Sequence, residues 1–583
     1  MNTFFCVHNY YTDKNNHVII DENQLTVMKK IKYHNTPSVY FRMLATMLSL
    51  LSVTILLLST NCKERSITEV AEVEIEKPNI IYIMADDLTT QAISSYGGIY
   101  KDIAPTPNID KIAADGVLFQ DVMCTNAICG PSRASILTGN YSNLNGYYKN
   151  EGGGKFDDSQ WTFPQEFQKN GYQTSLFGKW HLGTEPKGFD VFKYHNSANQ
   201  QGVYWNPTYN INGTDTKVKG YATNLTTEFA IDWLKKDRTK GNPFLMVLQY
   251  KAPHRPWEPD KKYETLWEDI EMPYPTTFND DYKGRELTAG DTEMTMDYFS
   301  RRDMKYQTPK GLKGKEKVKW EFYGAKPGEV VKPKGMSDEE ARKWRYQTYI
   351  KDYLACVKSV DDNVGKVLDY LDKNGLSDNT IVILTSDQGF YLGDHGFFDK
   401  RFIYEESVRM PFILKYPKMI NDKTTNHDLV SNIDFAPTLL DLANIKTDQK
   451  MQGQSFKPIL TGVKPENWQT GVYYHYYEFP YWHHVQPHYG IRTEKFTLAH
   501  FYYNIDVWEL YDLEKDPNQV NNVINNPEYT NVVNELKVQL RELMIKYENN
   551  KSLADFRKIT DTDFGSLVDK KNEEASVQDI LAN

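Results

Sequence analysis

A cysteine followed closely by a proline, a serine and an arginine is the first pattern in this sequence that could do chemistry. The motif Cys-Gly-Pro-Ser-Arg occupies residues 129–133 and runs into an apolar stretch that ends at Gly139. Because proline is tolerated in the first turn of a helix, the motif predicts a turn leading into a helix. A nucleophilic side chain would then face a helix N-terminus, where free N–H groups favour anions. A buried cysteine before an ordinary helix is the simpler alternative.

Two pairs of oxygen-bearing side chains each follow an apolar run. Asp86 and Asp87 come after the run 79–85, and Asp387 and Gln388 come after the β-branched run 380–385. In open parallel sheets the ligand crevice lies at the carboxyl ends of strands. Adjacent carboxylates there repel each other unless a cation lies between them, and calcium takes about six to eight oxygen ligands. A solvated turn would explain the first pair without a metal.

Two loops add basic and imidazole side chains. Lys179 and His181 lie between glycines in the motif G-K-W-H-L-G at 178–183, directly after a strand-like segment. His254 is flanked by Pro253 and Pro256, which stiffen its loop. These side chains could line one pocket at strand ends, or could be an exposed lysine and two histidines with ordinary hydrogen bonds.

Together these motifs resemble those of the type I sulfatases, which are relatives of alkaline phosphatase. The resemblance rests on C-x-P-S-R followed by A-S-x-L-T-G, on G-K-W-H-L-G and on P-H-x-P, and it extends from about residue 79 to about residue 522. It implies that Cys129 is converted to formylglycine, an aldehyde that is hydrated in use, by a maturation enzyme in the producing cell.

The resemblance also implies a role for each matching residue. The calcium ligands would be Asp86, Asp87, Cys129, Asp387 and Gln388. Lys179 and Lys400 would bind the sulfate group, and Arg133 would orient the formylglycine. His181 would handle the proton of the second hydroxyl of the hydrated aldehyde, and His254 would protonate the leaving alcohol oxygen.

Candidate substrate contacts form a further set. Asp399 and Arg401 flank Lys400 and could grip sugar hydroxyls, although each could equally be half of a surface ion pair. By resemblance, related enzymes bring substrate contacts to the cleft from the positions of His475, His483, His484, His488 and Arg492. For each of these histidines, packing in a strand or on the surface is the alternative.

The architecture expected from this resemblance is an α/β fold, with an alkaline-phosphatase-like mixed sheet sandwiched by helices. We expect a catalytic domain at 78–464, with an insertion at 258–335, and a smaller α+β subdomain on an antiparallel sheet at 465–550. A helix should begin with the capping box at Ser337 and end near Gly375. Residues 551–583 read as a polar tail.

The N-terminal residues 1–62 read as a leader and signal segment. An apolar h-region at 43–58 precedes Cys62, which resembles a lipoprotein acceptor, while Asn61 before it leaves cleavage by ordinary signal peptidase open. Residues 63–77 would form a charged tether. These features predict export to the periplasm or the cell surface, with lipid anchoring in the outer membrane as the only membrane contact.

Composition narrows the function classes. The formal net charge of −10 argues against a nucleic-acid partner, and 5 scattered cysteines give no disulfide framework. The resemblance, together with the leader segment, implies an exported, calcium-dependent sulfatase acting on a sulfated glycan. The part after residue 465 resembles polysaccharide sulfatases, both of the N-acetylglucosamine-6-sulfatase branch and of the ulvan type. A phosphonate monoester or phosphodiester hydrolase of the same superfamily, and an inactive glycan-binding lipoprotein, are the alternatives.

Overall fold

The computed structural model describes residues 76–299, 303–304, 333–420, 422–480 and 483–565. The signal and lipoprotein features expected within 1–62 lie outside the described residues, as do residues 305–332 of the expected insertion. Residues Lys77–Asn583 belong to one compact unit. Among the described helices, none combines the length and the apolar character needed to cross a membrane.

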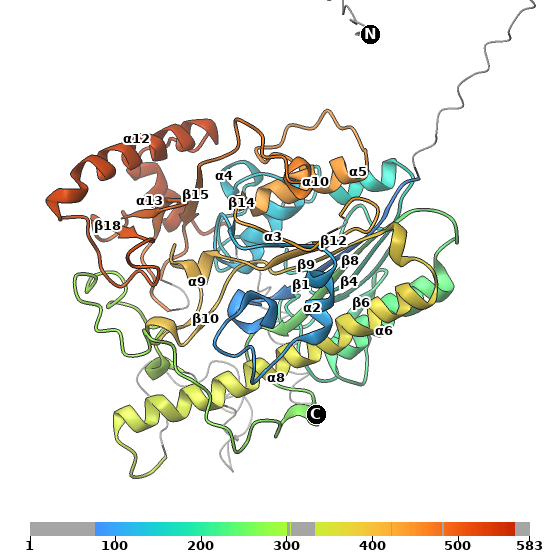
Figure 1. Ribbon diagram of the computed structural model, residues 1–583, viewed down its shortest axis with the longest axis horizontal. Helices are drawn as coiled ribbons and strands as arrows, with labels where there is room; N and C mark the ends of the chain where they lie inside the picture. The colour runs from blue at the N-terminus through green and yellow to red at the C-terminus, as the bar shows by residue number, and fades with distance from the viewer. Residues whose placement is uncertain (1–75, 300–302, 305–332, 421, 481–482, 566–583) are drawn as a thin grey trace, which may run out of the picture. The chain divides into compact units, whose positions relative to one another are not determined.

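A mixed sheet of ten strands forms the centre of this unit (Figure 1). Strand β1 (Asn79–Asp86) lies between β8 (Phe244–Pro253) and β9 (Thr380–Thr385), and all three are parallel. Beyond β9 the sheet continues, in this order, with β12 (Phe412–Lys415), β2 (Val117–Phe119) and β13 (Thr424–Asn426). Beyond β8 it continues, in this order, with β4 (Gln173–Gly178), β5 (Val191–His195), β6 (Thr208–Ile211) and β7 (Thr214–Lys217). Strand β12 is antiparallel to both of its neighbours.

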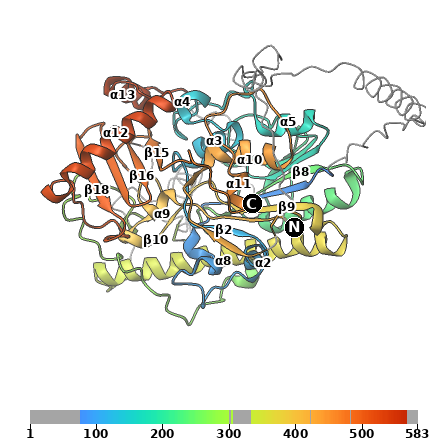
Figure 2. The same cartoon turned by 45° about the horizontal axis from the view of Figure 1, so that its top comes forward.

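Helices cover both faces of this sheet because its central strands are apolar on both sides. Every residue of β1 is buried, and alternate residues enter different cores: Tyr82 enters one, Ile83 the other. The helices on the Tyr82 side are α3 (Cys129–Thr138), α5 (Phe163–Lys169) and α10 (Phe435–Leu442); those on the Ile83 side are α2 (Pro107–Ala114), α6 (Ala222–Asp232) and α8 (Asp338–Lys373) (Figures 1 and 2). The expected fold class is confirmed.

Helix α8 begins and ends where the sequence predicts. Its N-cap is Ser337, whose backbone N–H donates to Glu340 Oε2 at 2.8 Å while the Ser337 hydroxyl accepts from the Glu340 N–H at 3.3 Å. Apolar side chains of the helix, which include Ile350 and Val357, are buried against the sheet. This reciprocal cap satisfies two of the N–H groups that a helix start leaves unpaired.

The C-terminal part is an antiparallel sheet of four strands in sequence order, joined by hairpin connections. Its strands are β15 (Gly471–Tyr476), β16 (His488–Thr493), β17 (Phe496–Phe501) and β18 (Val507–Asp512). Helix α12 (Thr530–Lys546) packs on one face. This confirms the expected second, smaller α+β part.

The segment interpreted as a polar tail, from residue 551, begins with a helix that the sequence analysis did not predict. Leu553–Asp561 form helix α13, which starts with a capping box between Ser552 and Asp555. Phe556 is fully buried and contacts the rings of His475 and Tyr489. Leu553 and Ile559 of the same helix are partly buried against this core, so three apolar side chains in a mostly polar segment carry the packing, and overall composition alone does not reveal it. The rest of the predicted tail, from 566, lies outside the described residues.

Shorter elements connect these parts. The remaining strands pair as β3 (Val122–Met123) with β14 (Val430–Ser431) and β10 (Tyr391–Leu392) with β11 (Phe398–Asp399). The remaining α-helices are α4 (Ser142–Asn145), α9 (Glu405–Val408) and α11 (Lys457–Leu460). Within the described part of the expected insertion, only short 3₁₀ turns occur, at Lys261–Tyr263 and Met296–Tyr298.

Candidate active site

The parallel pairing of β1 and β9 brings the two predicted acidic pairs together. Asp86 ends β1, and Asp387 follows β9 by two residues. The Asp87 backbone N–H donates to Asp387 Oδ1 at 3.2 Å. Carboxylate oxygens of Asp86, Asp87 and Asp387 lie within 4.8 Å of one another, and all three residues are 0% exposed. Three buried carboxylates at this separation need positive charge between or beside them.

Three cations supply positive charge from other elements. Lys179, at the end of β4, pairs with Asp86, and Lys400 Nζ lies 2.7 Å from Asp87 Oδ1. Arg133, one turn into α3, pairs with Asp387 Oδ2 at 2.9 Å. Lys179, Lys400 and Arg133 are themselves buried. The cluster is therefore balanced, with three carboxylates against three cations.

Gln249 completes the surroundings of Arg133. Its Oε1 accepts from Arg133 Nη1 at 2.8 Å, and the Lys179 carbonyl accepts from the same nitrogen at 3.2 Å. Gln249 lies in β8, where it is a polar residue inside an apolar run, and this was the available signal that sequence reasoning missed. The contact fixes the guanidinium from the side opposite the carboxylates.

Burial and mutual repulsion disturb the titration of the acidic groups. Burial raises the pKa of Asp87 to about 7; Lys400 opposes the shift, while Asp86 and Asp387 add to it. Burial also raises the pKa of Asp387. At Asp86 burial acts in the same direction, but Lys179, His254 and Arg133 outweigh it and hold the pKa well below its usual range. A divalent cation would favour the ionised form of all three.

The donor set fits a hard divalent cation such as calcium. Besides the three carboxylates, Gln388 contributes a side-chain amide whose Nε2 donates to Asp87 Oδ1. Its Oε1 is buried and has no hydrogen-bond partner among the described residues. Turning the amide would point this oxygen at the carboxylates and complete an all-oxygen set of the kind calcium prefers.

Cys129 is the first residue of α3 and faces this cluster. Its Sγ lies 3.9 Å from Asp87 Oδ1 and 3.7 Å from Gln388 Nε2, and the residue is 1% exposed. Burial raises the pKa of the thiol well above its usual value, and Lys179 and Lys400 only partly oppose this. An unmodified Cys129 is therefore a protonated, weakly nucleophilic thiol at neutral pH.

The two predicted histidines lie beside the cluster. His254 Nδ1 donates to the Arg255 carbonyl at 2.5 Å, and its Nε2 lies 3.8 Å from Asp87 Oδ2. His181 has a positive φ of 60° and is 1% exposed. Burial, together with the charge of Lys179, lowers the pKa of both histidines well below the usual value. Both imidazoles are therefore neutral at neutral pH.

Asp399 and Arg401 flank Lys400 and form an ion pair with each other. The second carboxylate oxygen of Asp399 accepts from Arg255 Nη1 at 3.3 Å and lies 3.0 Å from His483 Nε2. Arg255, which had no role in the sequence interpretation, also pairs with Asp303, with Nε 3.0 Å from Oδ1. Asp399 and Arg401 are buried, so the surface-pair alternative does not apply, and the network extends from Lys400 toward the C-terminal part.

The structure does not bring His475, His488 and Arg492 to the cluster, which corrects their assignment as substrate contacts. His475 stacks on Tyr477 at 3.7 Å between ring centroids. His488 Nε2 accepts from the Ile403 N–H at 3.1 Å, and the Arg492 guanidinium pairs with Glu405 and Asp121. Each side chain is buried with protein partners. These residues pack the C-terminal sheet because they lie on strands buried over their whole length.

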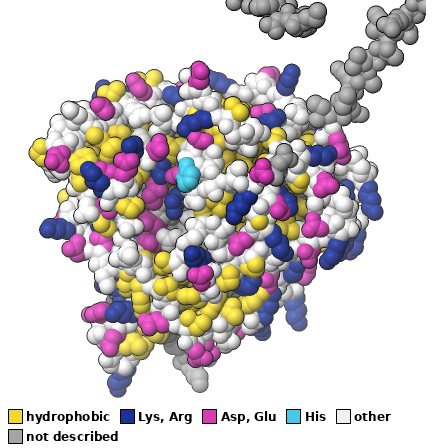
Figure 3. All heavy atoms as spheres, viewed as in Figure 1, with side chains coloured by type: hydrophobic (Ala, Val, Ile, Leu, Met, Phe, Trp, Pro, Cys, Tyr) yellow, Lys and Arg dark blue, Asp and Glu magenta, His cyan; other side chains and the backbone are white. Residues whose placement is uncertain are grey.

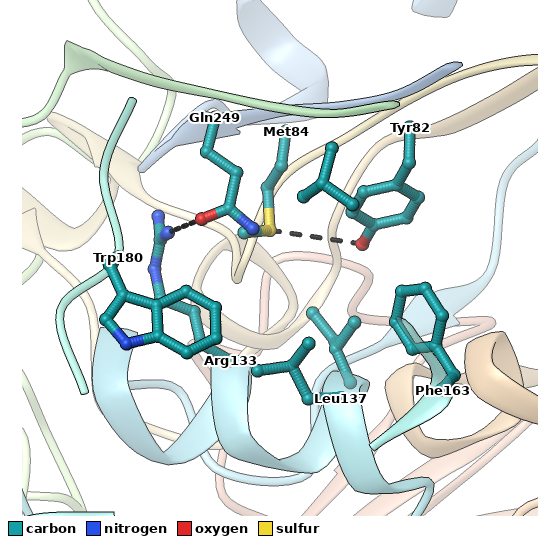
Figure 4. A pocket seen from close by; sticks show the side chains of 9 residues that line it. Tyr82, Met84, Arg133, Leu137, Phe163, Trp180 and Gln249 are labelled. Atoms are coloured by element: carbon teal, nitrogen blue, oxygen red, sulfur yellow. Dashed lines mark hydrogen bonds between the residues drawn. The ribbon is translucent and has the colours of Figure 1, made fainter. Parts of the chain in front are cut away.

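A small cavity lies behind the site, on the far side of Arg133. Its volume is about 10 Å³, and apolar side chains such as Met84, Leu137 and Phe163 line most of it (Figure 4). A space of this size holds about one water molecule at most. Gln249 and Arg133 meet along one side of the cavity in Figure 4. The cavity is a packing gap in the core and is too small for a substrate.

Charge elsewhere on the molecule is mixed. On the face shown in Figure 3, acidic and basic side chains are interspersed with apolar ones. The pairing of Lys179, Lys400 and Arg133 with three carboxylates is in contrast a concentrated, buried arrangement. The site can thus hold a metal ion and an anionic group together at the end of the central sheet.

Comparison with known proteins agrees with this arrangement. The sulfatase family model matches residues 78–445, and the model described as "N-sulphoglucosamine sulphohydrolase, C-terminal" matches residues 393–546. An N-acetylglucosamine-6-O-sulfatase of Bacteroides thetaiotaomicron is 41% identical, over 82% of this chain and 88% of the relative. An ulvan-active sulfatase of Formosa agariphila is 25% identical, over 83% and 84%.

A solved structure is similar over the same part of the chain. It is described as a complex with its substrate D-glucosamine-2-N,6-O-disulfate; the TM-score is 0.75 at 41% identity, over 82% of this chain and 99% of that one. The chain belongs to the sulfatase family, and it is a sulfuric ester hydrolase.

Proposed function

We propose that this chain hydrolyses a sulfate monoester on a glucosamine unit of a glycan, with calcium at the acidic cluster and formylglycine at position 129. The observation that carries the proposal is the placement of two buried ammonium groups, Lys179 and Lys400, beside three buried carboxylates and Cys129. A sulfate monoester needs cations for its oxygens and a nucleophile in line with the leaving oxygen. The site brings two such cations and the side chain of residue 129 to one place, which supports the proposal.

The state of Cys129 supports its modification. A buried thiol with a raised pKa is a poor nucleophile, although it lies where the attacking atom would be needed. Formylglycine would supply, as a hydrated aldehyde, one hydroxyl that attacks and a second whose deprotonation releases the sulfate. A maturation enzyme in the producing cell would carry out the conversion.

The metal would act on the same side of the site. Bound to the oxygens of Asp86, Asp87, Asp387 and Gln388, calcium would supply a Lewis acid for a sulfate oxygen and lower the pKa of the nucleophile. Lys179 and Lys400 neutralise the remaining sulfate oxygens as charge develops. Arg133, held by Asp387 and Gln249, keeps the nucleophile side of the site in place.

The histidines suit proton transfer. The hydrogen bond from His254 Nδ1 to the Arg255 carbonyl fixes the tautomer, so Nε2 is the nitrogen available to the site. An anionic ester between the two lysines would raise the pKa of His254, which would let it protonate the leaving alcohol oxygen. Neutral His181 is suited to accept a proton from the second hydroxyl.

The substrate class rests on relatives and on the network beside Lys400. The relative with 41% identity is named for N-acetylglucosamine 6-O-sulfate, whereas the ulvan-active relative is 25% identical. A glucosamine 6-sulfate therefore has the better support. Asp399 and Arg401 adjoin the sulfate-binding lysine, where the sugar hydroxyls would lie. Together they offer both acceptors and donors for hydroxyl groups.

Export is part of the proposal. The h-region at 43–58 and Cys62 support secretion, with lipid attachment at Cys62 as the membrane contact. A sulfated glycan outside the cell would then be the substrate in the periplasm or at the cell surface. Labelling of the full-length protein with a lipid precursor, compared with Cys62→Ala, tests the anchor: loss of label in the variant supports it, and an unlabelled wild-type protein contradicts it.

One experiment tests mechanism and substrate class together. The protein is produced with a maturation enzyme, and the mass of the peptide containing residue 129 is measured. Sulfate release is measured on glucosamine 6-sulfate and ulvan fragments, and release of the alcohol is measured on a phosphonate monoester. A mass loss of about 18 Da at residue 129, the thiol-to-aldehyde change, with release from glucosamine 6-sulfate supports the proposal. Conversion with turnover of the phosphonate ester alone would replace it by the rival hydrolase, and an unmodified Cys129 would refute formylglycine.

A further inference from the structure

Helix α3, which carries Cys129, lacks the usual cap at its start. Its N-cap residue is Ile128, which has no side-chain oxygen to accept from the first N–H groups. Instead, the side chain of Asn150, from a loop 20 residues later, accepts from the Gly130 N–H at 3.0 Å. Asn150 therefore takes the place of an N-cap residue directly beside the predicted nucleophile.

The fit around Gly130 is close. A Cβ atom at this position would lie 2.5 Å from a ring carbon of Tyr147 and 2.7 Å from Asn150 Oδ1. Such distances are far inside van der Waals contact, so a residue other than glycine would push the 147–150 loop away from the helix. The loop and the first turn of α3 thus form one packed unit.

Glu478 holds this loop from the C-terminal part of the protein. It follows β15 by two residues and is 0% exposed. Its Oε2 accepts from the backbone N–H groups of Asn150 at 2.8 Å and Glu151 at 2.9 Å. Its Oε1 has no hydrogen-bond partner among the described residues. Burying a carboxylate costs free energy, and here its hydrogen bonds hold two consecutive peptide groups in place.

We infer that Asn150 and Glu478 are positioning residues that set the location of residue 129 through the Gly130 peptide. The inference rests on the proposed function, because it requires residue 129 to carry the nucleophile. The hydrogen bonds form one continuous path from Glu478, just after β15, through Asn150 to the residue next to Cys129. Misplacement of a reacting atom by about 1 Å can cost about 100-fold in rate. The chain thereby couples the C-terminal sheet to the reaction site.

The effect should appear in turnover and hardly in substrate affinity, since neither residue belongs to the lysine and arginine groups proposed to hold the substrate. For Asn150→Ala we expect kcat to fall about 10- to 100-fold with KM within about twofold of wild type. Asn150→Asp keeps an acceptor oxygen for the Gly130 N–H and should recover most of the loss. Glu478→Ala should resemble Asn150→Ala, and Glu478→Gln, which keeps an oxygen for the two N–H groups, should resemble wild type.

The test compares kcat, KM and the melting temperature on matured protein, with conversion of residue 129 checked by mass so that only converted enzyme is counted. Asn143→Ala is the matched control, because the Asn143 side chain also bridges to the C-terminal part, through the Tyr547 carbonyl, but it lies in α4 and not in the loop that caps α3. A loss of kcat in Asn150→Ala that Asn150→Asp recovers supports the inference. If Asn150→Ala and Asn150→Asp have the same kcat, or if Asn143→Ala loses as much kcat as Asn150→Ala, the inference is overturned.

Two further measurements keep the outcome decisive. If Asn150→Ala does not fold, Asn150→Ser, with a shorter side chain, replaces it in the same comparison. Cys129→Ala is measured in parallel. Full activity of Cys129→Ala would refute the proposed nucleophile, whereas an inactive Cys129→Ala together with unchanged Asn150 variants would refute the positioning role alone.

Discussion

Lys400 Nζ lies 2.7 Å from Oδ1 and 2.9 Å from Oδ2 of Asp87, a carboxylate 313 residues earlier in the chain. The ammonium group thus contacts the oxygens that a calcium ion would take. When a divalent cation occupies Asp87, repulsion should turn Lys400 toward an incoming anionic ester. The same lysine would then neutralise the empty site and bind sulfate in the loaded one.

Removal of this cation should mainly affect the chemical step. For Lys400→Ala we expect kcat/KM on a sulfated glucosamine to fall by about 100- to 1000-fold, the range found when one group stabilising a transition-state oxygen is lost. Steady-state kinetics on matured protein measures it. Lys415→Ala is the control, because Lys415 pairs with Asp115 away from the site and should leave kcat/KM unchanged. A Lys400→Ala enzyme within about twofold of wild type would remove Lys400 from the mechanism.

Metal removal should reduce both activity and stability. A chelator would remove the proposed calcium ion from the three buried carboxylates and leave only Lys179, Lys400 and Arg133 beside them, so we expect sulfate release to stop and the melting temperature to drop. Calcium at about 100 times its Kd should restore about 2.7 kcal/mol of unfolding free energy. Asp387→Asn should lose most of this calcium-dependent rise. If neither the activity nor the melting temperature changes when chelator or calcium is added, a metal at this cluster is contradicted.

Much of the site could be predicted because its residues lie in short motifs at the ends of strands. Asp86, Lys179 and Asp387 each follow an apolar run, and parallel strands carry such residues to one edge of a sheet. Local sequence is therefore sufficient to group them. The start of α8 could be predicted for a similar reason, because a capping box is complete within four residues.

The residues that were missed depend on contacts between distant parts of the chain. Gln249 and Arg133 are 116 residues apart, and Glu478 meets Asn150 across 328 residues. No local pattern records such partners. The misassignment of His475 has a related cause: it lies in a run of consecutive aromatic residues without a clear alternation, and the packing of α13 against that strand shows that its ring is enclosed. The packing thus decides between a binding role and a core role.

The stability of the protein should depend on the ionisation of Glu478. Burial raises the pKa of this carboxyl from 4.5 to about 7, with Arg401 opposing the shift. Between these values the unfolded chain has lost the proton that the folded protein keeps, so the free energy of unfolding falls as pH rises from about 4.5 to about 7. Above that range the full cost of burying the charge remains.

Glu478→Gln tests this dependence, because the amide keeps an acceptor oxygen and cannot ionise. We expect the melting temperature of the variant relative to wild type to increase from pH 4.5 to pH 8. Thermal unfolding of metal-loaded protein at several pH values measures it. Glu514→Gln is the control, since the ion pair of Glu514 with Lys495 is exposed. A difference between Glu478→Gln and wild type that does not change with pH would show that Glu478 has an ordinary pKa.

The network beside Lys400 should discriminate sugars without taking part in sulfate hydrolysis itself. Arg401 pairs with Asp399 and has a buried Nε without a hydrogen-bond partner among the described residues, so it has donor capacity left for a ligand. For Arg401→Ala we expect kcat/KM on glucosamine 6-sulfate to fall about 100-fold, as hydrogen bonds to a charged group are worth about 1.5–3 kcal/mol. Turnover of an aryl sulfate, which has no sugar hydroxyls, should change less than about threefold. A parallel loss on both substrates would instead assign Arg401 to the sulfate site, and no loss on either would remove it from substrate recognition.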